Sequence, residues 1–130
     1  MARILIADDA LFARLLLRKI FTDAGHEVVG EASTGREAVE RYAELHPDLV
    51  TLDIIMPDMD GITALKKIRE IDPNARIIMI TSVDSYKKLV ECIEAGASGY
   101  IVKPFEPADV IKEVERVLKS RDRAGRGSES

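Results

Sequence analysis

The sequence predicts an α/β domain built on a doubly wound, five-stranded parallel sheet. Short runs rich in β-branched residues alternate five times with longer segments of helical period, which is the pattern of successive βα units. Several of these runs are apolar without alternation, for example residues 4–6 and 77–80, which suits strands covered by helices on both faces. A chain of 130 residues is long enough for one such domain with one core.

The expected strands are short and mostly apolar. They lie at residues 3–7, 28–32, 49–52, 77–80 and 100–102. The first helix is expected over residues 10–24, with Gly25 just past its end as a stop signal. Its apolar stripe, which we expect to face the core, consists of Phe12, Leu15, Leu16 and Ile20.

Start and stop signals mark four further helices. Thr34 and Glu37 have the spacing of a capping box at the start of the second helix, which ends before Pro47. Asp60 is the expected N-cap of the third helix and Asp84 that of the fourth. Pro107 is expected in the first turn of the fifth helix. The expected core residues are Ala38, Val39 and Tyr42 in the second helix; Ile62, Leu65 and Ile68 in the third; Tyr86, Leu89, Val90 and Ile93 in the fourth; and Val110, Ile111, Val114, Val117 and Leu118 in the fifth.

The folded domain is expected to span residues 1–119, and residues 120–130 are expected to form a disordered tail. That tail contains no apolar side chain larger than alanine that could be buried. Hydrophobic residues make up 46% of the chain and charged residues 32%, and no apolar run approaches the ~20 residues that a membrane span requires. Without a signal-peptide pattern at its start, the chain is expected to be cytoplasmic, and a monomer.

Charge and composition favour proteins as partners. The net charge of −4 argues against binding to nucleic acid and to anionic membranes. Cys92 is the one cysteine, so it cannot form an intrachain disulfide, and we interpret it as a small buried hydrophobe. His26 and His46 are expected at the surface without a catalytic role.

Polar side chains that could form a site follow four of the predicted strands at their carboxyl ends, where open α/β sheets bind ligands. They are Asp8 and Asp9 after the first strand, Asp53 after the third, Thr81 after the fourth and Lys103 after the fifth. Two carboxylates about 4 Å apart, at a dielectric constant near 20, repel each other by about 4 kcal/mol, so three of them require a cation. An all-oxygen site with open positions favours Mg²⁺.

Phosphoryl transfer to a carboxylate is the chemistry that these residue types favour. With Mg²⁺ and Lys103 present, an incoming phosphoryl group meets positive charge, a hydroxyl donor from Thr81 and a carboxylate that can attack in line. Asp53 is the favoured nucleophile, because Asp8 and Asp9, which are neighbours in the sequence and point opposite ways if the strand continues, are better suited as metal ligands. Each residue alone could be an ordinary cap, turn or strand-end residue, but five on one edge of a sheet favour the functional interpretation.

Four blocks of the sequence resemble the receiver domains of two-component signalling proteins. They are residues 4–9 (ILIADD), 52–61 (LDIIMPDMDG), 81–82 (TS) and 99–105 (GYIVKPF), and the resemblance extends from about Ala2 to Leu118. It implies a (βα)5, flavodoxin-like fold with strand order 2-1-3-4-5. It also implies that the protein catalyses its own phosphorylation, from a histidine kinase or a small phosphodonor, and its own dephosphorylation, rather than acting as a conventional enzyme.

The resemblance implies a role for each matched residue. Asp53 would be the phosphoacceptor; Asp8, Asp9, Asp53 and the backbone carbonyl of Ile55 would hold Mg²⁺; Thr81 and Lys103 would contact the phosphoryl oxygens; and the Lys103–Pro104 peptide bond would be cis. Ile55 and Val83 would lie at the mouth of the site. Because neither can hydrogen-bond an attacking water and both are stiff, we predict that they slow dephosphorylation.

Within the family, residues 10–14 and 30–39 and the lack of an output domain are similar to chemotaxis response regulators of the CheY type. Tyr100 then matches an aromatic switch that turns inward when Thr81 engages phosphate. The face formed by the fourth helix, fifth strand and fifth helix would bind a protein target, such as the flagellar motor switch. Residues 83–86 (VDSY) depart from the Gln-rich stretch usual in chemotaxis members, which leaves the partner open.

Other interpretations remain open beside this one. The chain could be a receiver domain excised from a larger regulator, a phosphorelay intermediate, or an interaction module that works without phosphorylation. An aspartyl-nucleophile phosphatase needs two aspartates separated by one residue after the first strand, a spacing that Asp8-Asp9 lacks. A flavodoxin-like electron carrier would share the fold, but the same pair would repel a flavin phosphate.

Overall fold

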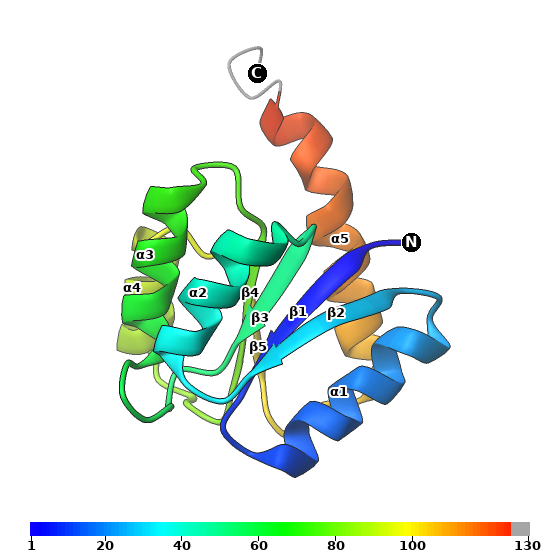
Figure 1. The fold of residues 1–130 in the computed structure, drawn as a ribbon, viewed down its shortest axis with the longest axis horizontal. Coiled ribbons are helices and arrows are strands. Elements are labelled where there is room, and N and C mark those ends of the chain that lie inside the picture. Colours follow the sequence, from blue (N-terminus) through cyan, green and yellow to red (C-terminus); the bar gives the residue numbers. More distant parts are fainter. Residues whose placement is uncertain (126–130) are drawn as a thin grey trace.

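The computed structural model describes residues 1–125 and has the predicted doubly wound sheet (Figure 1). Five strands alternate with five helices along the described chain: β1 (Arg3–Ala7), α1 (Leu11–Asp23), β2 (Glu27–Ala32), α2 (Gly35–Leu45), β3 (Leu49–Leu52), α3 (Gly61–Ile71), β4 (Ile77–Thr81), α4 (Tyr86–Glu94), β5 (Gly99–Val102) and α5 (Pro107–Gly125). All neighbouring strands are parallel, in the order β2-β1-β3-β4-β5. The predicted fold class and strand order are therefore confirmed.

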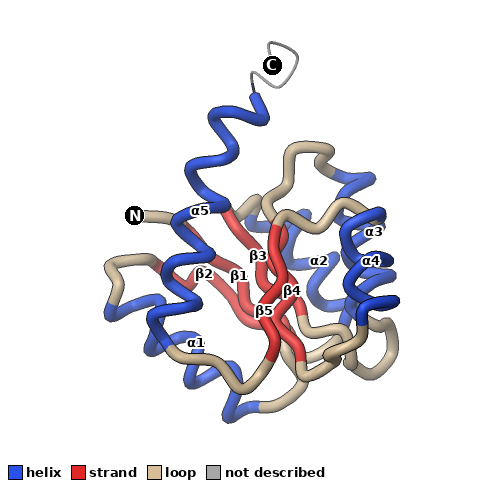
Figure 2. The backbone as a smooth tube through the Cα atoms, turned by 180° about the vertical axis from the view of Figure 1, so that it is seen from behind, coloured by secondary structure: helices blue, strands red, loops and turns tan. Residues whose placement is uncertain are grey.

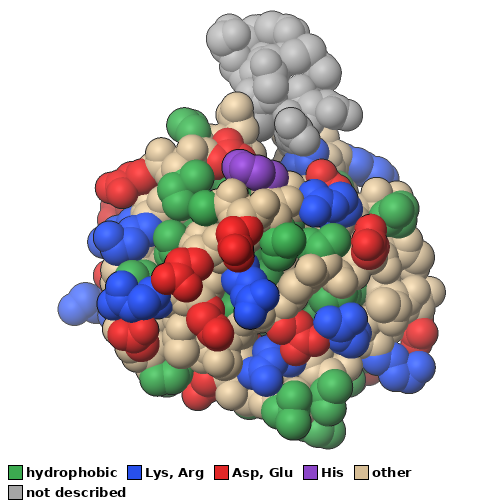
Figure 3. All heavy atoms as spheres, in the orientation of Figure 1, with side chains coloured by type: hydrophobic (Ala, Val, Ile, Leu, Met, Phe, Trp, Pro, Cys, Tyr) green, Lys and Arg blue, Asp and Glu red, His purple; other side chains and the backbone are tan. Residues whose placement is uncertain are grey.

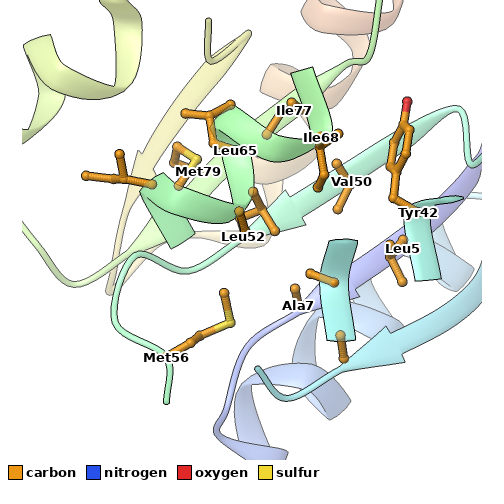
Figure 4. Close-up of a cluster of buried hydrophobic side chains, with 14 of the residues drawn as sticks. Leu5, Ala7, Tyr42, Val50, Leu52, Met56, Leu65, Ile68, Ile77 and Met79 are labelled. Atoms are coloured by element: carbon orange, nitrogen blue, oxygen red, sulfur yellow. The ribbon is translucent and has the colours of Figure 1, made fainter. Parts of the chain in front are cut away.

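Helices cover both faces of the sheet, with α1 and α5 on one side and α2, α3 and α4 on the other (Figure 2). Each side has its own group of buried side chains. On the α2–α3–α4 side, Leu5, Val50 and Leu52 of the strands pack with Tyr42 and Leu65 of the helices (Figure 4). Successive side chains of each apolar strand therefore point to opposite faces of the sheet and enter the two cores in turn.

The strands end close together at the edge that carries the polar residues, and β4 extends two residues beyond Met79, which pairs with the last residue of β3. Ala7 is paired with Ala32 on one side and with Leu52 on the other, and Thr81 is paired with Val102. The residues that immediately follow β1, β3 and β5 therefore lie along a single edge of the sheet, as predicted from the positions of the strand ends.

The predicted buried stripe of α1 is confirmed only at Ile20 and is wrong at Phe12, Leu15 and Leu16. Phe12 and Leu15 are 78% and 53% exposed, whereas the buried residues of the helix are Leu17, Ile20 and Phe21. Leu11 and Leu16 are also exposed. In Figure 3, hydrophobic atoms gather at the lower edge of the molecule, over the start of α1 in the matching view of Figure 1. Because apolar residues surround most of this helix, its period fits more than one face, and packing on the sheet decides which face is buried.

The start and the buried face of α4 also differ from the prediction. The N-cap is Ser85, whose hydroxyl oxygen accepts a hydrogen bond from the backbone N–H of Lys88 at 3.3 Å, and not Asp84. Tyr86 and Ile93, predicted to be core residues, are exposed. Cys92 is the buried residue of the helix, which confirms its interpretation as a core side chain. Asp84 and Ser85 are both good capping residues, so composition alone could not choose between them.

The last helix is longer than the sequence predicted. Helix α5 continues to Gly125, into the segment from residue 120 for which we expected disorder, and residues 126–130 of that segment lie outside the described residues. The division of the chain at residue 119 stays a prediction. Within residues 1–125, none of the helices combines the length and apolar character needed to cross a membrane.

The two phenylalanines of α1 provide a test of which face of the helix is buried. Phe21→Ala should lower the free energy of unfolding by about 3–5 kcal/mol, because Phe21 is fully buried and its loss leaves a cavity. Phe12→Ala should change it by no more than about 0.5 kcal/mol, since Phe12 faces solvent. Urea unfolding at equilibrium measures both values, and a larger loss for Phe12→Ala than for Phe21→Ala would contradict this packing.

Candidate functional site

Three carboxylates meet at the carboxyl edge of the sheet. Asp8 directly follows β1 and Asp53 directly follows β3; both are buried, while Asp9 beside them is exposed. One carboxylate oxygen from each of the three lies within 4.8 Å of the other two. Because like charges at this separation repel strongly in a partly buried site, the cluster requires positive charge close by.

Lys103 supplies positive charge at the same carboxyl edge of the sheet. It follows β5, and its Nζ donates hydrogen bonds to Asp8 Oδ2 at 2.6 Å and to Asp53 Oδ2 at 3.0 Å. Burial alone would lower the pKa of the ammonium group, but its hydrogen bonds to Asp8 and Asp53 outweigh that effect, and the pKa of Lys103 is raised. The lysine therefore stays charged at neutral pH. The Lys103–Pro104 peptide bond is cis, as the family resemblance implied.

Thr81 and Tyr100 both form hydrogen bonds with the backbone of Val83. Thr81 is fully buried at the end of β4, and its Oγ1 accepts a hydrogen bond from the N–H of Val83 at 3.3 Å. The hydroxyl of Tyr100 donates to the carbonyl oxygen of Val83 at 2.7 Å. Burial raises the pKa of Tyr100, and the nearby Cys92 adds to the effect, so the phenol stays protonated as the donor. Accepting the Val83 N–H leaves the Thr81 hydroxyl hydrogen able to donate elsewhere.

The loop after β3 is held so that the Asp53 carboxylate faces the cluster. Asp53 Oδ1 accepts a hydrogen bond from the N–H of Ile55 at 3.2 Å, and the N–H of Gly61 donates to the carbonyl oxygen of Ile54 at 2.7 Å. A Cβ on Gly61 would overlap the backbone carbonyl of Asp53, so only glycine permits this approach. The Ile55 side chain is left 62% exposed at the rim, and that of Val83 is half-buried.

The residues present fit a hard divalent cation. The three clustered side chains offer only carboxylate oxygens, the ligands that Mg²⁺ prefers, and Asp9 leaves the cluster open toward solvent. A bound Mg²⁺ would neutralise the negative charge of a phosphoryl group brought to this edge. Asp8, Asp9 and Asp53 are placed to hold it. The backbone carbonyl of Ile55 as a further ligand stays a prediction.

Sequence reasoning missed Arg14, which is bonded to the segment that carries two of the carboxylates. Its Nη1 donates a hydrogen bond to the backbone carbonyl of Asp8 at 2.7 Å, and its Nε donates to Glu31 Oε1 at 2.9 Å. The available signal was an arginine near the start of the first helix, flanked by apolar residues (residues 11–17, LFARLLL). His26 is engaged elsewhere, accepting a hydrogen bond from the N–H of Ala2 at its Nδ1.

An open α/β sheet with an Asp, Asp, Asp, Thr and Lys set at its carboxyl edge is the arrangement of a phosphoacceptor domain. The chain matches the model of the response regulator receiver domain over residues 4–115. That match covers most of the chain, so the protein belongs to this family, as its motifs implied.

Among its relatives, the chain is similar to chemotaxis protein CheY of Thermotoga maritima, with 53% identity over 117 residues that make up 90% of this chain and 98% of that protein. It is also similar to the structure of a CheX–CheY–BeF3–Mg complex from Borrelia burgdorferi, with a TM-score of 0.87 and 42% identity, covering 89% of this chain and 88% of the other. The chain is thus a receiver domain homologous to the CheY chemotaxis regulators.

Receiver domains of this kind also occur within longer proteins. A protein-glutamate methylesterase/protein-glutamine glutaminase of Archaeoglobus fulgidus is 43% identical over 104 residues, which are 78% of this chain and 30% of that protein. Sequence similarity alone is therefore compatible with a free-standing regulator and with a receiver domain that forms part of a longer protein.

The proposed metal ligands can be tested by Mg²⁺ titration. Asp9→Ala should raise the Kd for Mg²⁺ more than about tenfold, because it removes a carboxylate from the cluster without emptying a buried position. Asp58→Asn, in the loop between β3 and α3 that begins with Asp53, should leave the Kd unchanged. Asparagine suits this control because Asp58 has a left-handed backbone with φ of 71°, which asparagine tolerates. Isothermal titration calorimetry measures both, and equal Kd values for the two variants would contradict the ligand set.

Proposed function

We propose that this protein is a phosphorylation-activated switch of a two-component system, with Asp53 as the phosphoacceptor. The observation that carries the proposal is the buried Asp53 carboxylate, bonded to Lys103 and clustered with Asp8 and Asp9 at one edge of the sheet. A histidine kinase is the proposed phosphodonor, since two-component signalling defines the family. The protein acts as catalyst on itself and not on a separate substrate.

Asp53, Lys103 and Thr81 have separate roles in the proposed phosphoryl transfer. An oxygen of Asp53 attacks the phosphorus in line; the new O–P bond forms as the N–P bond of the phosphohistidine breaks, and its electron pair leaves with the imidazole nitrogen. Lys103 moves from pairing carboxylates to stabilising the charge of the phosphoryl oxygens. The free hydroxyl hydrogen of Thr81 donates to another of these oxygens.

The signal passes from Thr81 to Tyr100 through the backbone of Val83. When the Thr81 hydroxyl turns to a phosphoryl oxygen, its bond to the Val83 N–H changes, and the carbonyl of the same residue holds Tyr100. Tyr100 in turn lines a shallow groove between α4 and α5, together with Leu89, Ile93 and Glu113. We propose that this α4–β5–α5 face changes with phosphorylation and binds the protein target.

Chemotaxis is the proposed process, with the flagellar motor switch as the proposed target. The likeness to CheY proteins along nearly their whole length supports this role. The net charge of −4 favours a protein target over nucleic acid or a membrane surface. A receiver domain that forms part of a longer regulator is the second candidate, supported by the partial match to the methylesterase. Both candidates use the same site.

A small phosphodonor tests the proposed function directly. With acetyl phosphate and Mg²⁺, the wild-type chain should gain one acid-labile phosphoryl group, seen by intact mass. Asp53→Asn should abolish the adduct, because the swap keeps the volume of the side chain and removes the nucleophile. Asp58→Asn is the matched control and should label like the wild type. Labelling of Asp53→Asn at the wild-type level would overturn the assignment.

The lifetime of the phosphorylated state is proposed to depend on Ile55 and Val83. Loss of the phosphoryl group needs a water aligned opposite the aspartyl oxygen, and neither side chain can hydrogen-bond such a water. The exposed Ile55 and the half-buried Val83 instead add apolar, β-branched surface close to Asp53 and Thr81. We therefore propose slow autodephosphorylation.

Substitutions with polar side chains should shorten that lifetime. Ile55→Asn should speed loss of the label by about tenfold, which corresponds to about 1.4 kcal/mol in the barrier, and Ile55→Asn with Val83→Glu should speed it further. Loss of the label is followed by intact mass after the phosphodonor is removed. Ile71→Asn is the control, since Ile71 is an exposed isoleucine at the end of α3. Equal rates in all variants would show that these two residues do not limit the lifetime.

A further inference from the structure

We propose that Arg14 is a positioning residue for the two metal-binding aspartates of the β1–α1 segment, and that Glu31 anchors it there. The inference rests on the proposed Mg²⁺-dependent function and goes further, since it assigns a role to two residues that touch neither the metal nor the phosphoryl group. The guanidinium joins the backbone carbonyl of Asp8, at 2.7 Å, to Glu31 on the edge strand β2, at 2.9 Å.

Besides Arg14, three hydrogen bonds hold Asp8 in the β1–α1 segment, one of which is donated by Lys103 Nζ to Asp8 Oδ2 at 2.6 Å. Asp8 is bonded through its N–H to the carbonyl of Ala32 at 3.0 Å, and its Oδ1 accepts from the N–H of Ala10 at 2.9 Å. The N-cap residue of α1 is Ala10, which has no side chain able to cap the helix. The bond from Arg14 to the Asp8 carbonyl is therefore the side-chain contact that fixes the peptide between Asp8 and Asp9.

Glu31 holds the guanidinium firmly. Both of its carboxylate oxygens are engaged, one by Arg14 and the other by Arg18, whose Nη2 lies 2.7 Å away. The Arg14 side chain is only 16% exposed, so this pairing is shielded from water on most sides. Burial of Glu31 acts to raise its pKa, but the hydrogen bonds from Arg18 and Arg14 outweigh it, and the pKa is lowered. The anchor is therefore ionised at neutral pH.

The two contacts need the fork geometry of arginine. Nε and Nη1 lie on the same planar group and donate in different directions, one to a carboxylate and one to a backbone carbonyl. A lysine has a single nitrogen at the end of a flexible stem, so it can reach either acceptor but cannot hold the two at a fixed separation. The orientation of the Asp8–Asp9 peptide, and with it the spacing of the two carboxylates, depends on that separation.

Arg69 provides a control at the opposite edge of the sheet, as another arginine that donates hydrogen bonds to two separate segments. It donates to the backbone carbonyls of Pro73 at 2.8 Å and Gly96 at 2.6 Å, in the loops that precede β4 and β5. Like Arg14, it is a partly buried arginine that joins two segments. Its removal should destabilise the fold without any effect on Mg²⁺ binding.

The experiment compares Arg14→Met, Arg14→Lys and Arg69→Met. Isothermal titration with Mg²⁺ alone measures the Kd, and urea unfolding measures stability. Arg14→Met should raise the Kd by about tenfold, the usual effect of losing a residue that orients a metal ligand. Arg14→Lys should recover only part of that loss. Arg69→Met should keep the wild-type Kd while lowering stability. A wild-type Kd in folded Arg14→Met, or an equal shift in Arg69→Met, would overturn the proposal.

Glu31→Gln is the second variant, in case Arg14→Met does not fold. It keeps the arginine but weakens its anchor, so the Kd for Mg²⁺ should rise by about threefold; an unchanged Kd would also overturn the proposal. Failure of the wild-type chain to bind Mg²⁺ or to accept a phosphoryl group would refute the proposed function itself. An active wild type with an unaltered Arg14→Met would refute only the role of Arg14.

Discussion

The repulsion among three carboxylates at one sheet edge is the constraint on which the site depends. Pairs at these distances repel by an amount of the order of 4 kcal/mol, which is a large fraction of the stability of a domain of this size. Lys103 offsets part of that cost from the far end of the sequence, through bonds to Asp8 and Asp53. The parallel strand ends and the close approach at Gly61 hold these charges in one arrangement, and we propose the same role for the arginine on α1.

Most of the fold and the central residues of the site could be predicted because the sequence signals are local. Apolar runs without alternation indicate strands covered on both faces, and the residue that ends each strand is read directly from the run. Asp53 and Lys103 were found in this way, because the topology of parallel strands brings all their carboxyl ends to the same edge. The cis bond before Pro104 was implied by the family resemblance and not by the local pattern.

The features that the sequence could not settle are choices among neighbours or contacts between distant segments. In α1, apolar residues surround most of the helix, so the period could not tell Phe12 from Phe21, on the opposite face, as the core residue. At the start of α4, two adjacent capping residues compete, and only the backbone path selects Ser85. Arg14 and Glu31 are 17 residues apart, and their pairing depends on how α1 packs beside β2.

The backbone of Val83 joins the phosphorylation site to the face proposed for target binding, and this has an evolutionary consequence. Both contacts, from Thr81 on one side and Tyr100 on the other, are made to main-chain atoms that every residue except proline possesses. The side chain at this position is therefore free to vary while the mechanical link is retained. In the proposed mechanism, a substitution of the Val83 side chain changes the duration of the signal but keeps the backbone contacts that transmit it, so a lineage could retune the timing of its response without redesigning its output.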